Sequence, residues 1–126
     1  MIHGIGTDIV ATRRMAQLHA RYGGKLAQRV LAPEEWGEYA QAPDKTRFLA
    51  KRFAAKEALA KALGTGMRAP VTFSAIRVTH DARGRPAFAY APELQAWLRT
   101  RALGPCHLSV SDEVEYAVAF VVMERA

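Results

Sequence analysis

Between Arg47 and Gly66, five cationic side chains surround a single carboxylate, Glu57, and the stretch ends in Gly-Thr-Gly. Lys61 follows Glu57 by four residues, so the two side chains would lie on the same side of a helix. Cations and backbone amides bind phosphate oxygens, and a carboxylate can hold a divalent metal ion. The stretch therefore suits a polyphosphate ligand, although the same spacing is also typical of an ordinary exposed Glu–Lys ion pair.

A magnesium site needs more than one ligand, and Asp8 is the candidate for the second. Magnesium commonly takes one or two protein carboxylates and completes its coordination with waters and substrate phosphates. Asp8 stands near the expected end of an apolar N-terminal strand, where the alternative interpretation is a cap or turn acid. At the other end of the site, Gly64 is expected to be a left-handed helix cap, and Thr65 and Gly66 to present unobstructed amides.

The pattern of apolar residues and breakers predicts helices that alternate with short strands. Helices are expected at 13–22, 26–31, from Pro33 to before Pro43, 44–63 and 92–101, with Thr12 and Asp44 as caps. Strands are expected at 2–10, 71–80, 85–90, 106–111 and 116–123. This order predicts an α+β fold in which mostly antiparallel strands pack with one long and several short helices.

The expected helices have distinct apolar and polar sides. In the long helix, the apolar stripe consists of Leu49, Phe53, Ala60 and Leu63. In the first helix, the side chains expected to face inward are Met15, Leu18 and Tyr22. Arg14 and Arg21 lie on a different side of that helix, and we expect them to be solvated.

Size and composition favour a single domain over residues 1–126. One cysteine, Cys106, excludes a disulfide framework and a cysteine-rich zinc site. No apolar run approaches the roughly 20 residues needed to span a bilayer. The N-terminal segment lacks a basic region and contains Asp8, so it is not typical of a signal peptide. We therefore expect a cytoplasmic protein that does not bind a membrane.

The net charge of +6 comes entirely from residues 1–70, which have 12 basic and 6 acidic residues against 6 and 6 in the remainder. Such a field favours an anionic partner. A nucleic-acid-binding module is one alternative. The aromatic residues are scattered, however, without a stacking platform or zinc-finger spacing, so we expect no nucleic acid partner.

Three segments and a short link between them carry a family resemblance. They are GIGTDIV at 4–10, FLAKRFAAKEALAKALGTG at 48–66 and HLSVSDEVEYAVAFVV at 107–122, with GRP at 84–86. Together they resemble the holo-acyl-carrier-protein synthases, which are the small single-domain members of the 4′-phosphopantetheinyl transferase superfamily. The middle segment is long and specific, and the resemblance extends over nearly the whole chain.

The resemblance implies transfer of phosphopantetheine from coenzyme A to a serine of apo acyl carrier protein, a priming step for fatty acid biosynthesis. It implies that Asp8 and Glu57 bind Mg²⁺ and that Lys61 holds the phosphates or stabilises the departing one. The base for the serine hydroxyl is either a metal-bound water or one of the two carboxylates. The family's α+β fold assembles as a homotrimer, with coenzyme A in clefts between subunits.

The resemblance also implies further binding residues. The cofactor cleft is expected to contain Arg52, Lys61, Gly64, Thr65, Gly66, Pro86 and His107. Arg14 and Arg21 match positions at which the family presents cations to its acidic carrier protein. Many members have a second histidine where this chain has Asp112, so no role for that histidine is carried over. A non-catalytic trimeric scaffold that binds acyl carrier protein is the remaining alternative, and its binding would survive loss of Asp8 and Glu57.

Overall fold

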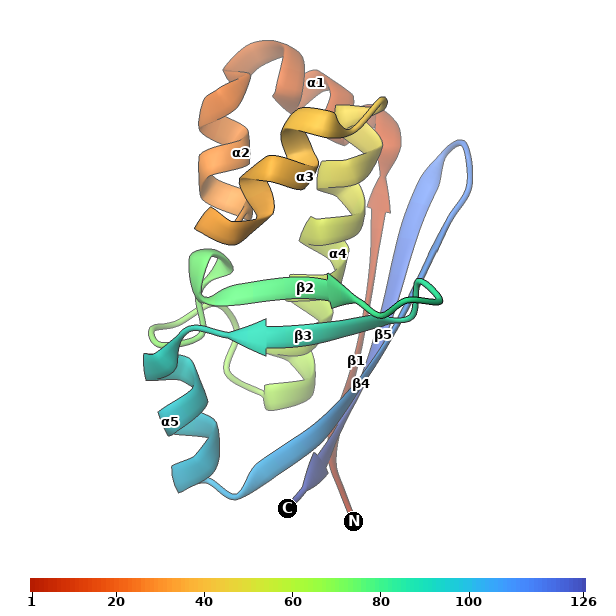
Figure 1. The fold of residues 1–126 in the computed structure, drawn as a ribbon. Helices are drawn as coiled ribbons and strands as arrows, with labels where there is room; N and C mark the ends of the chain where they lie inside the picture. Colours follow the sequence, from red (N-terminus) through yellow and green to blue (C-terminus); the bar gives the residue numbers. More distant parts are fainter.

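Helix α4 (Lys45–Leu63) passes through the middle of the molecule, and the other elements surround it (Figure 1). The Asp44 side chain caps its start by accepting a hydrogen bond from the Arg47 N–H at 3.0 Å. Gly64 ends it in the left-handed conformation, with φ of 77°. Both ends agree with the sequence prediction. The structure is a computed structural model that describes residues 1–126.

Two antiparallel sheets accompany this helix. The larger has the order β1-β5-β4, formed by β1 (Ile2–Ala11), β5 (Tyr116–Arg125) and β4 (Leu103–Asp112). The smaller is a hairpin of β2 (Ile76–His80) and β3 (Pro86–Tyr90), which crosses in front of α4 in Figure 1. Separate antiparallel sheets with helices between them confirm the predicted α+β class.

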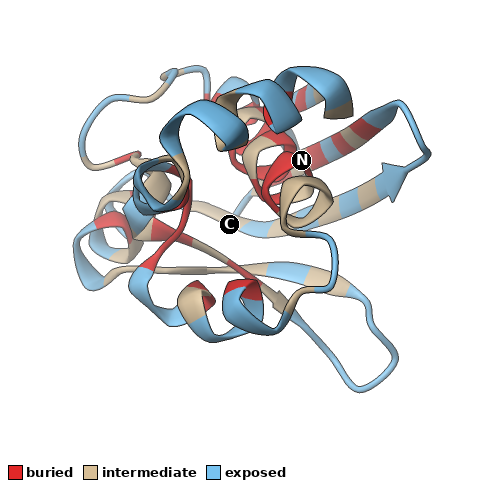
Figure 2. Cartoon of the chain, turned by 90° about the horizontal axis from the view of Figure 1, so that it is seen from above, coloured by how far each residue is buried: buried red, intermediate tan, exposed pale blue.

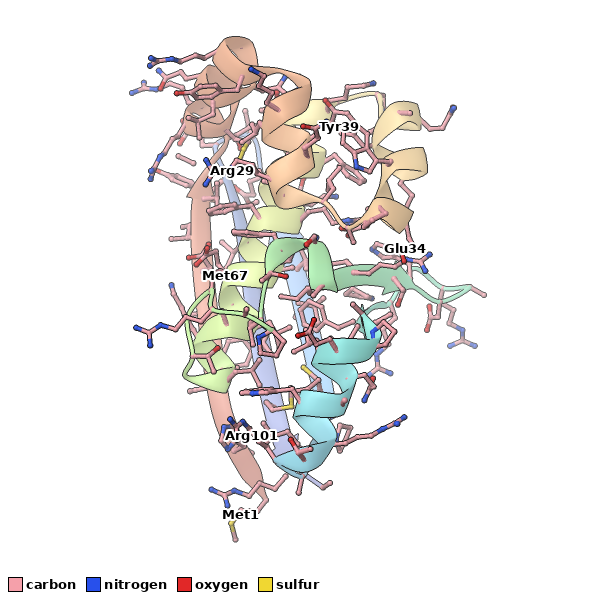
Figure 3. The ribbon with its side chains drawn as sticks, turned by 90° about the vertical axis from the view of Figure 1, so that its left-hand side faces the viewer. Met1, Arg29, Glu34, Tyr39, Met67 and Arg101 are labelled. Carbon is pink, nitrogen blue, oxygen red and sulfur yellow. The ribbon has the colours of Figure 1, made fainter.

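Four shorter helices complete the fold, and none of the five helices combines the length and apolar content needed to cross a bilayer. They are α1 (Thr12–Tyr22), α2 (Gly24–Val30), α3 (Trp36–Gln41) and α5 (Pro92–Thr100), with 3₁₀ turns at Pro33–Glu35 and Phe73–Ala75. The first three helices gather at one end of the molecule and α5 lies toward the other (Figure 1). Figure 3 shows Arg29 and Tyr39 at the first end, with Arg101 and Met1 at the opposite end.

Several boundaries differ from the prediction. β1 continues to Ala11, which pairs with Tyr116, so Asp8 lies inside the strand rather than at its end. Thr12 is the first residue of α1 and not its cap, because Ala11 occupies the cap position without a side-chain hydrogen bond. The predicted single helix after Pro33 divides into a 3₁₀ turn and α3, and the strand predicted from residue 71 begins at 76.

Helix α4 is buried on nearly all sides, and the prediction of a single apolar stripe beside a solvated basic side was wrong. The helix packs against β1 and β5, and it also contacts α1, α2, α3 and β2. Figure 2 shows the buried residues gathered at the centre, with the outer helices exposed on their outer sides. Even two of its cationic residues, Arg52 and Lys56, are buried. Tyr22 of α1, predicted to face inward, is exposed.

Candidate active site

Two glycines allow β1 to contact α4 backbone to backbone. A Cβ atom at Gly4 would stand 2.1 Å from the Ala62 carbonyl oxygen, and one at Gly6 would stand 2.0 Å from that of Ala58. No other residue type fits these positions without moving the strand away. Because side chains on a strand alternate, Asp8 points to the same face as these glycines. The sequence GIGTD therefore brings the Asp8 carboxylate against α4.

Asp8 forms an ion pair with Lys61 of α4. The Lys61 ammonium donates to Oδ1 of Asp8 at 3.0 Å and to the Thr7 carbonyl oxygen at 2.9 Å. The Lys61 side chain is 53% exposed, whereas that of Asp8 is 16% exposed. The Glu57–Lys61 ion pair suggested by the helical spacing does not form, because the ammonium turns toward the strand instead.

The carboxylates of Asp8 and Glu57 are left with uncompensated negative charge. Oδ2 of Asp8 is buried and has no hydrogen-bond partner. Burial raises the pKa of Glu57, the negative charge of Asp8 raises it further, and Lys61 opposes both effects. Two carboxylates with a single ammonium close to them form a site that attracts an additional cation.

This donor set fits a magnesium ion. Carboxylate oxygens are the ligands that Mg²⁺ prefers, and one or two from the protein are usual, with waters and phosphates supplying the remainder. The buried, unpartnered Oδ2 of Asp8 is the observation that supports the fit. No group of three or more His, Cys, Asp or Glu side chains is arranged for a metal anywhere in the chain. Asp8 and Glu57 thus form the candidate metal centre.

The Gly-Thr-Gly turn after α4 is less open to phosphate than its composition suggests. The Gly64 amide donates to the carbonyl oxygens of Ala60 and Lys61, and the Thr65 amide also donates to Ala60. The Thr65 hydroxyl donates to the Gly66 carbonyl oxygen at 2.8 Å. Of the three amides, that of Gly66 alone has no backbone acceptor. The expectation that both Thr65 and Gly66 present free amides is therefore corrected to Gly66 alone.

Arg52 lies away from this group within one chain. It precedes Lys61 by nine residues, which places the two side chains on about opposite sides of the helix. Its guanidinium stacks 4.4 Å from the Phe48 ring centroid, and its Nη2 donates to Glu38 at 3.0 Å. Its Nε lies 3.1 Å from Glu35. Burial lowers the pKa of Arg52 and these carboxylates partly offset that effect, so the group is held inside as a paired cation.

A buried ionic cluster of Glu35, Lys56 and Arg52 lies behind this position. The Lys56 ammonium donates to Glu35 at 2.5 Å and to the carbonyl oxygens of Val30 and Phe73 at 2.7 and 3.0 Å. Glu35 also accepts from the backbone amides at Ala32 and Val78. All three ammonium protons thus have acceptors, and the cluster connects α2, α4, both 3₁₀ turns and β2.

Sequence reasoning missed this cluster, although a signal was present. Lys56 stands in the centre of the predicted stripe, seven residues from both Leu49 and Leu63, where an apolar residue is expected. A lysine at such a position requires a buried carboxylate partner. Glu35 lies in the first turn of the helix predicted from Pro33, and its side chain reaches back to the Ala32 amide. Nothing in the sequence shows that the same carboxylate meets Lys56.

Arg52 and Pro86 share a cavity of about 340 Å³ between α4 and the hairpin. Lys51, His80 and Asp112 also line it. The Asp112 carboxylate lies 3.4 Å from the Arg47 guanidinium in an ion pair. The cavity thus contains two cations of α4 and none of the Asp8 group.

His107 and Pro86 line a second cavity, of about 330 Å³, between β3 and β4. Nε2 of His107 lies 2.5 Å from the Glu124 carboxylate on the neighbouring strand. His107 is half-exposed, so it remains accessible from outside. Pro86 therefore links the cavities of Arg52 and His107.

Arg14 lies close to the Asp8 group. Arg14 and Asp8 line one mostly apolar cavity of about 360 Å³ between β1 and α1, together with Met15, Leu26 and Phe53. Arg21 is exposed farther along α1, with its guanidinium 5.3 Å from the centre of the Tyr22 ring.

The predicted site residues therefore divide into two groups within one chain. We call Asp8, Glu57 and Lys61, with the turn at Gly64–Gly66, the carboxylate half-site. We call Arg52, Pro86 and His107 the basic half-site. None of the five main cavities contains residues of both.

Known proteins of one family match this chain over nearly its whole length. Residues 4–121 match the model of the 4′-phosphopantetheinyl transferase superfamily. A holo-[acyl-carrier-protein] synthase from Nitrosospira multiformis is 53% identical over 99% of this chain and 100% of its own.

Two solved structures have the same fold. The crystal structure of holo-[acyl-carrier-protein] synthase from Neisseria meningitidis has a TM-score of 0.96 and 50% identity, over 99% of this chain and 100% of that one. The enzyme from Bacillus anthracis, described in complex with CoA (3′,5′-ADP), has a TM-score of 0.84 and 36% identity, over 100% and 99%. This chain belongs to the 4′-phosphopantetheinyl transferase superfamily.

Proposed function

We propose that this chain transfers the 4′-phosphopantetheine group of coenzyme A to a serine of apo acyl carrier protein. A bond forms between the serine oxygen and the phosphorus that carries pantetheine. The bond from that phosphorus to the bridging oxygen breaks, and adenosine 3′,5′-bisphosphate leaves. Identity above 50% over the full length to a holo-[acyl-carrier-protein] synthase supports this activity. The Bacillus anthracis structure, described with CoA (3′,5′-ADP), supports the choice of cofactor.

The observation that carries the proposal is the carboxylate half-site. Asp8 and Glu57 would hold Mg²⁺, which when bound neutralises charge on the diphosphate as it is cleaved. Lys61 has one ammonium proton left after its bonds to Asp8 and Thr7, and this proton can be donated to a phosphate oxygen. The serine proton goes to a water molecule or to one of the two carboxylates.

Mass spectrometry of apo acyl carrier protein tests the activity directly. Incubation with this protein, coenzyme A and Mg²⁺ should add one phosphopantetheine group, and EDTA should prevent the addition. No mass gain with several carrier proteins would contradict the proposal. Retained carrier binding by a variant that lacks both Asp8 and Glu57, without turnover by the parent protein, would favour the scaffold alternative.

The division into half-sites supports an active site shared between two copies of the chain, as in the homotrimer that the family resemblance implies. In this assembly the carboxylate half-site of one subunit faces the basic half-site of its neighbour. Coenzyme A would lie between them, with its diphosphate near Lys61 and its nucleotide end near Arg52 and His107. Either half-site alone supplies part of the charge that this cofactor requires.

The uncovered face of the larger sheet is the surface on which such copies could meet. Opposite α4, no helix covers this sheet (Figure 1), and Ile5, Ile9 and Phe120 remain 60%, 62% and 45% exposed. An antiparallel sheet face of this apolar character normally packs against something. His107 pairs with Val122, which pairs with Ile5, so the histidine belongs to the same exposed face.

Complementation between inactive variants tests the shared site. Glu57→Gln impairs the carboxylate half-site and His107→Ala, at a half-exposed position, impairs the basic half-site, so each homotrimer should be inactive. When the two variants are co-expressed equally and assemble at random, about one quarter of all sites would combine two intact halves, and activity should recover to about that fraction. If each chain contains a complete site, the mixed trimers will stay inactive.

Arg14 and Arg21 are proposed to receive the acidic carrier protein. The shared cavity with Asp8 supports this role for Arg14, because a serine delivered there would arrive next to the carboxylate half-site. Charges of opposite sign on the two proteins would speed their encounter. The cytoplasmic location expected from the sequence stays a prediction.

A further inference from the structure

In this structure the Lys61 ammonium occupies the position of a counter-ion to Asp8. It bonds to Oδ1 at 3.0 Å and leaves Oδ2 of the same carboxylate buried without a partner. One positive charge thus partly neutralises the two carboxylates that fit a divalent cation. Charges this close interact strongly even at an intermediate effective dielectric, so the ammonium opposes binding of a second cation to Asp8.

The Lys61 ammonium is bound weakly enough to exchange Asp8 for another anion. Its side chain is 53% exposed and has two hydrogen-bond acceptors, one of them the Thr7 carbonyl oxygen. Lys56, five residues earlier on the same helix, is fully buried and has three acceptors. A lysine side chain is long and flexible, so Lys61 can move from Asp8 to another anion at the surface of the site without disturbing the fold.

We propose that Lys61 couples divalent-cation binding to coenzyme A binding by exchanging partners. Without the cofactor, its ammonium stays on Asp8 and keeps the affinity for the cation low. The cofactor's diphosphate attracts the ammonium away from Asp8, and the freed carboxylate then binds the cation more tightly. Because such coupling is reciprocal, the cation strengthens coenzyme A binding by the same factor. This inference rests on the function proposed above.

Binding of Mn²⁺, measured by electron paramagnetic resonance, tests the exchange without reference to turnover. The dissociation constant of Mn²⁺ is measured on the full chain without cofactor and at saturating coenzyme A, with a correction for Mn²⁺ bound by free coenzyme A. For the wild type we expect weak binding alone and much tighter binding with coenzyme A. In Lys61→Met, Mn²⁺ alone should bind about tenfold more tightly than in the wild type, because the opposing charge is gone.

The coupling itself should also decrease. In Lys61→Met, coenzyme A should increase the Mn²⁺ affinity by a smaller factor than in the wild type, since no ammonium remains to be displaced. Lys61→Arg keeps the charge and should keep weak binding of Mn²⁺ alone. Lys25→Met removes one positive charge at an exposed position of α2, outside the candidate site, and should leave Mn²⁺ affinity unchanged. Lys61→Gln provides a second neutral variant if Lys61→Met folds poorly.

Two results separate failure of this inference from failure of the proposed function. If Mn²⁺ binds the wild type, is lost in Glu57→Gln and binds Lys61→Met no more tightly, the exchange is overturned while the metal site stands. If Mn²⁺ does not bind even with coenzyme A, or binds Glu57→Gln equally well, the metal site itself is wrong and the exchange falls with it.

Discussion

Helix α4 presents two lysines to carboxylates, Lys56 on its buried side and Lys61 on its accessible side, and the two pairs differ in completeness. Lys56 donates all of its ammonium protons, and its partner Glu35 accepts two backbone amides besides. Lys61 keeps a proton free, and its partner Asp8 keeps a buried oxygen without any partner. The hydrogen bonds of the Lys56–Glu35 cluster are complete, whereas those of the Lys61–Asp8 pair are not.

This difference indicates which charges support the fold and which are available for a ligand. A buried cluster whose hydrogen bonds are complete has no site for an additional ion. Removal of one of its members lowers the stability of the fold. An incomplete cluster near the surface has binding capacity left, at some cost in stability. Charge density along the helix does not reveal this, because Lys56 and Lys61, one of each kind, are only five residues apart.

Removal of Lys56 should have the largest effect on stability. Lys56→Met leaves the buried Glu35 carboxylate without its closest counter-charge, which should cost about 3–5 kcal/mol in the free energy of unfolding. Urea denaturation followed by circular dichroism measures this loss. Lys61→Met is the matched control, the same substitution on the same helix, and should cost less than about 1 kcal/mol because that side chain is half exposed. Equal losses would remove the distinction between the clusters.

Removal of Glu57 should have the next largest effect, on activity instead of stability. Glu57→Gln keeps the shape but removes a charge from the carboxylate half-site, and should lower kcat/KM by about a hundredfold or more. The free energy of unfolding should stay the same or increase slightly, because burial and Asp8 disfavour the charged form of Glu57. Steady-state kinetics and urea denaturation of one preparation check both outcomes. A variant that is unfolded would mean that this cluster is structural too.

The buried cluster should also have a smaller effect, on how the free energy of unfolding changes with pH. Burial lowers the pKa of Lys56 to about 8, with Glu35 partly opposing the shift. An unfolded lysine has a pKa of about 10.4, so between about 8 and 10.4 the unfolded chain binds more protons and this group makes stability rise with pH. Below about 8 both states are protonated, and its contribution stays constant.

A doubly substituted chain isolates this contribution. In the Glu35→Gln/Lys56→Met variant, the increase between pH 8 and pH 10 should be smaller than in the wild type by about 1–3 kcal/mol. Urea denaturation at each pH measures the difference, and other titrating groups cancel between the two proteins. An equal or larger increase in the variant would show that Lys56 titrates normally.

Substitution of Arg14 should have the smallest effect and should change only the interaction with the carrier protein. Arg14→Glu replaces attraction of an acidic carrier by repulsion next to the carboxylate half-site, and should raise the KM for acyl carrier protein about fivefold to tenfold. The KM for coenzyme A should change little. Equal changes in both KM values would place Arg14 within the cofactor site instead. Arg14 would then have to be counted with Lys61 among the cations available for a ligand.

Local features of the fold could be predicted from the sequence because they depend on near neighbours. Asp44 and Gly64 define the ends of α4 through capping and a left-handed residue, and both were predicted. The helix at Pro33 was predicted less well, because Glu35 uses its side chain to bind distant residues instead of extending a helix. Strand ends were also less accurate, since pairing with a partner strand extends β1 past Asp8 to Ala11.

By itself, the sequence determined the family and the α+β class, and the family resemblance predicted that Asp8 and Glu57 act together. It also contained the two glycines without which β1 could not approach α4. Only the tertiary structure decided which cation meets which carboxylate. It placed both Lys56 and Arg52 inside with Glu35, and it turned Lys61 toward Asp8. These pairings join residues about 20 to 50 positions apart, and such contacts depend on packing that no local pattern encodes.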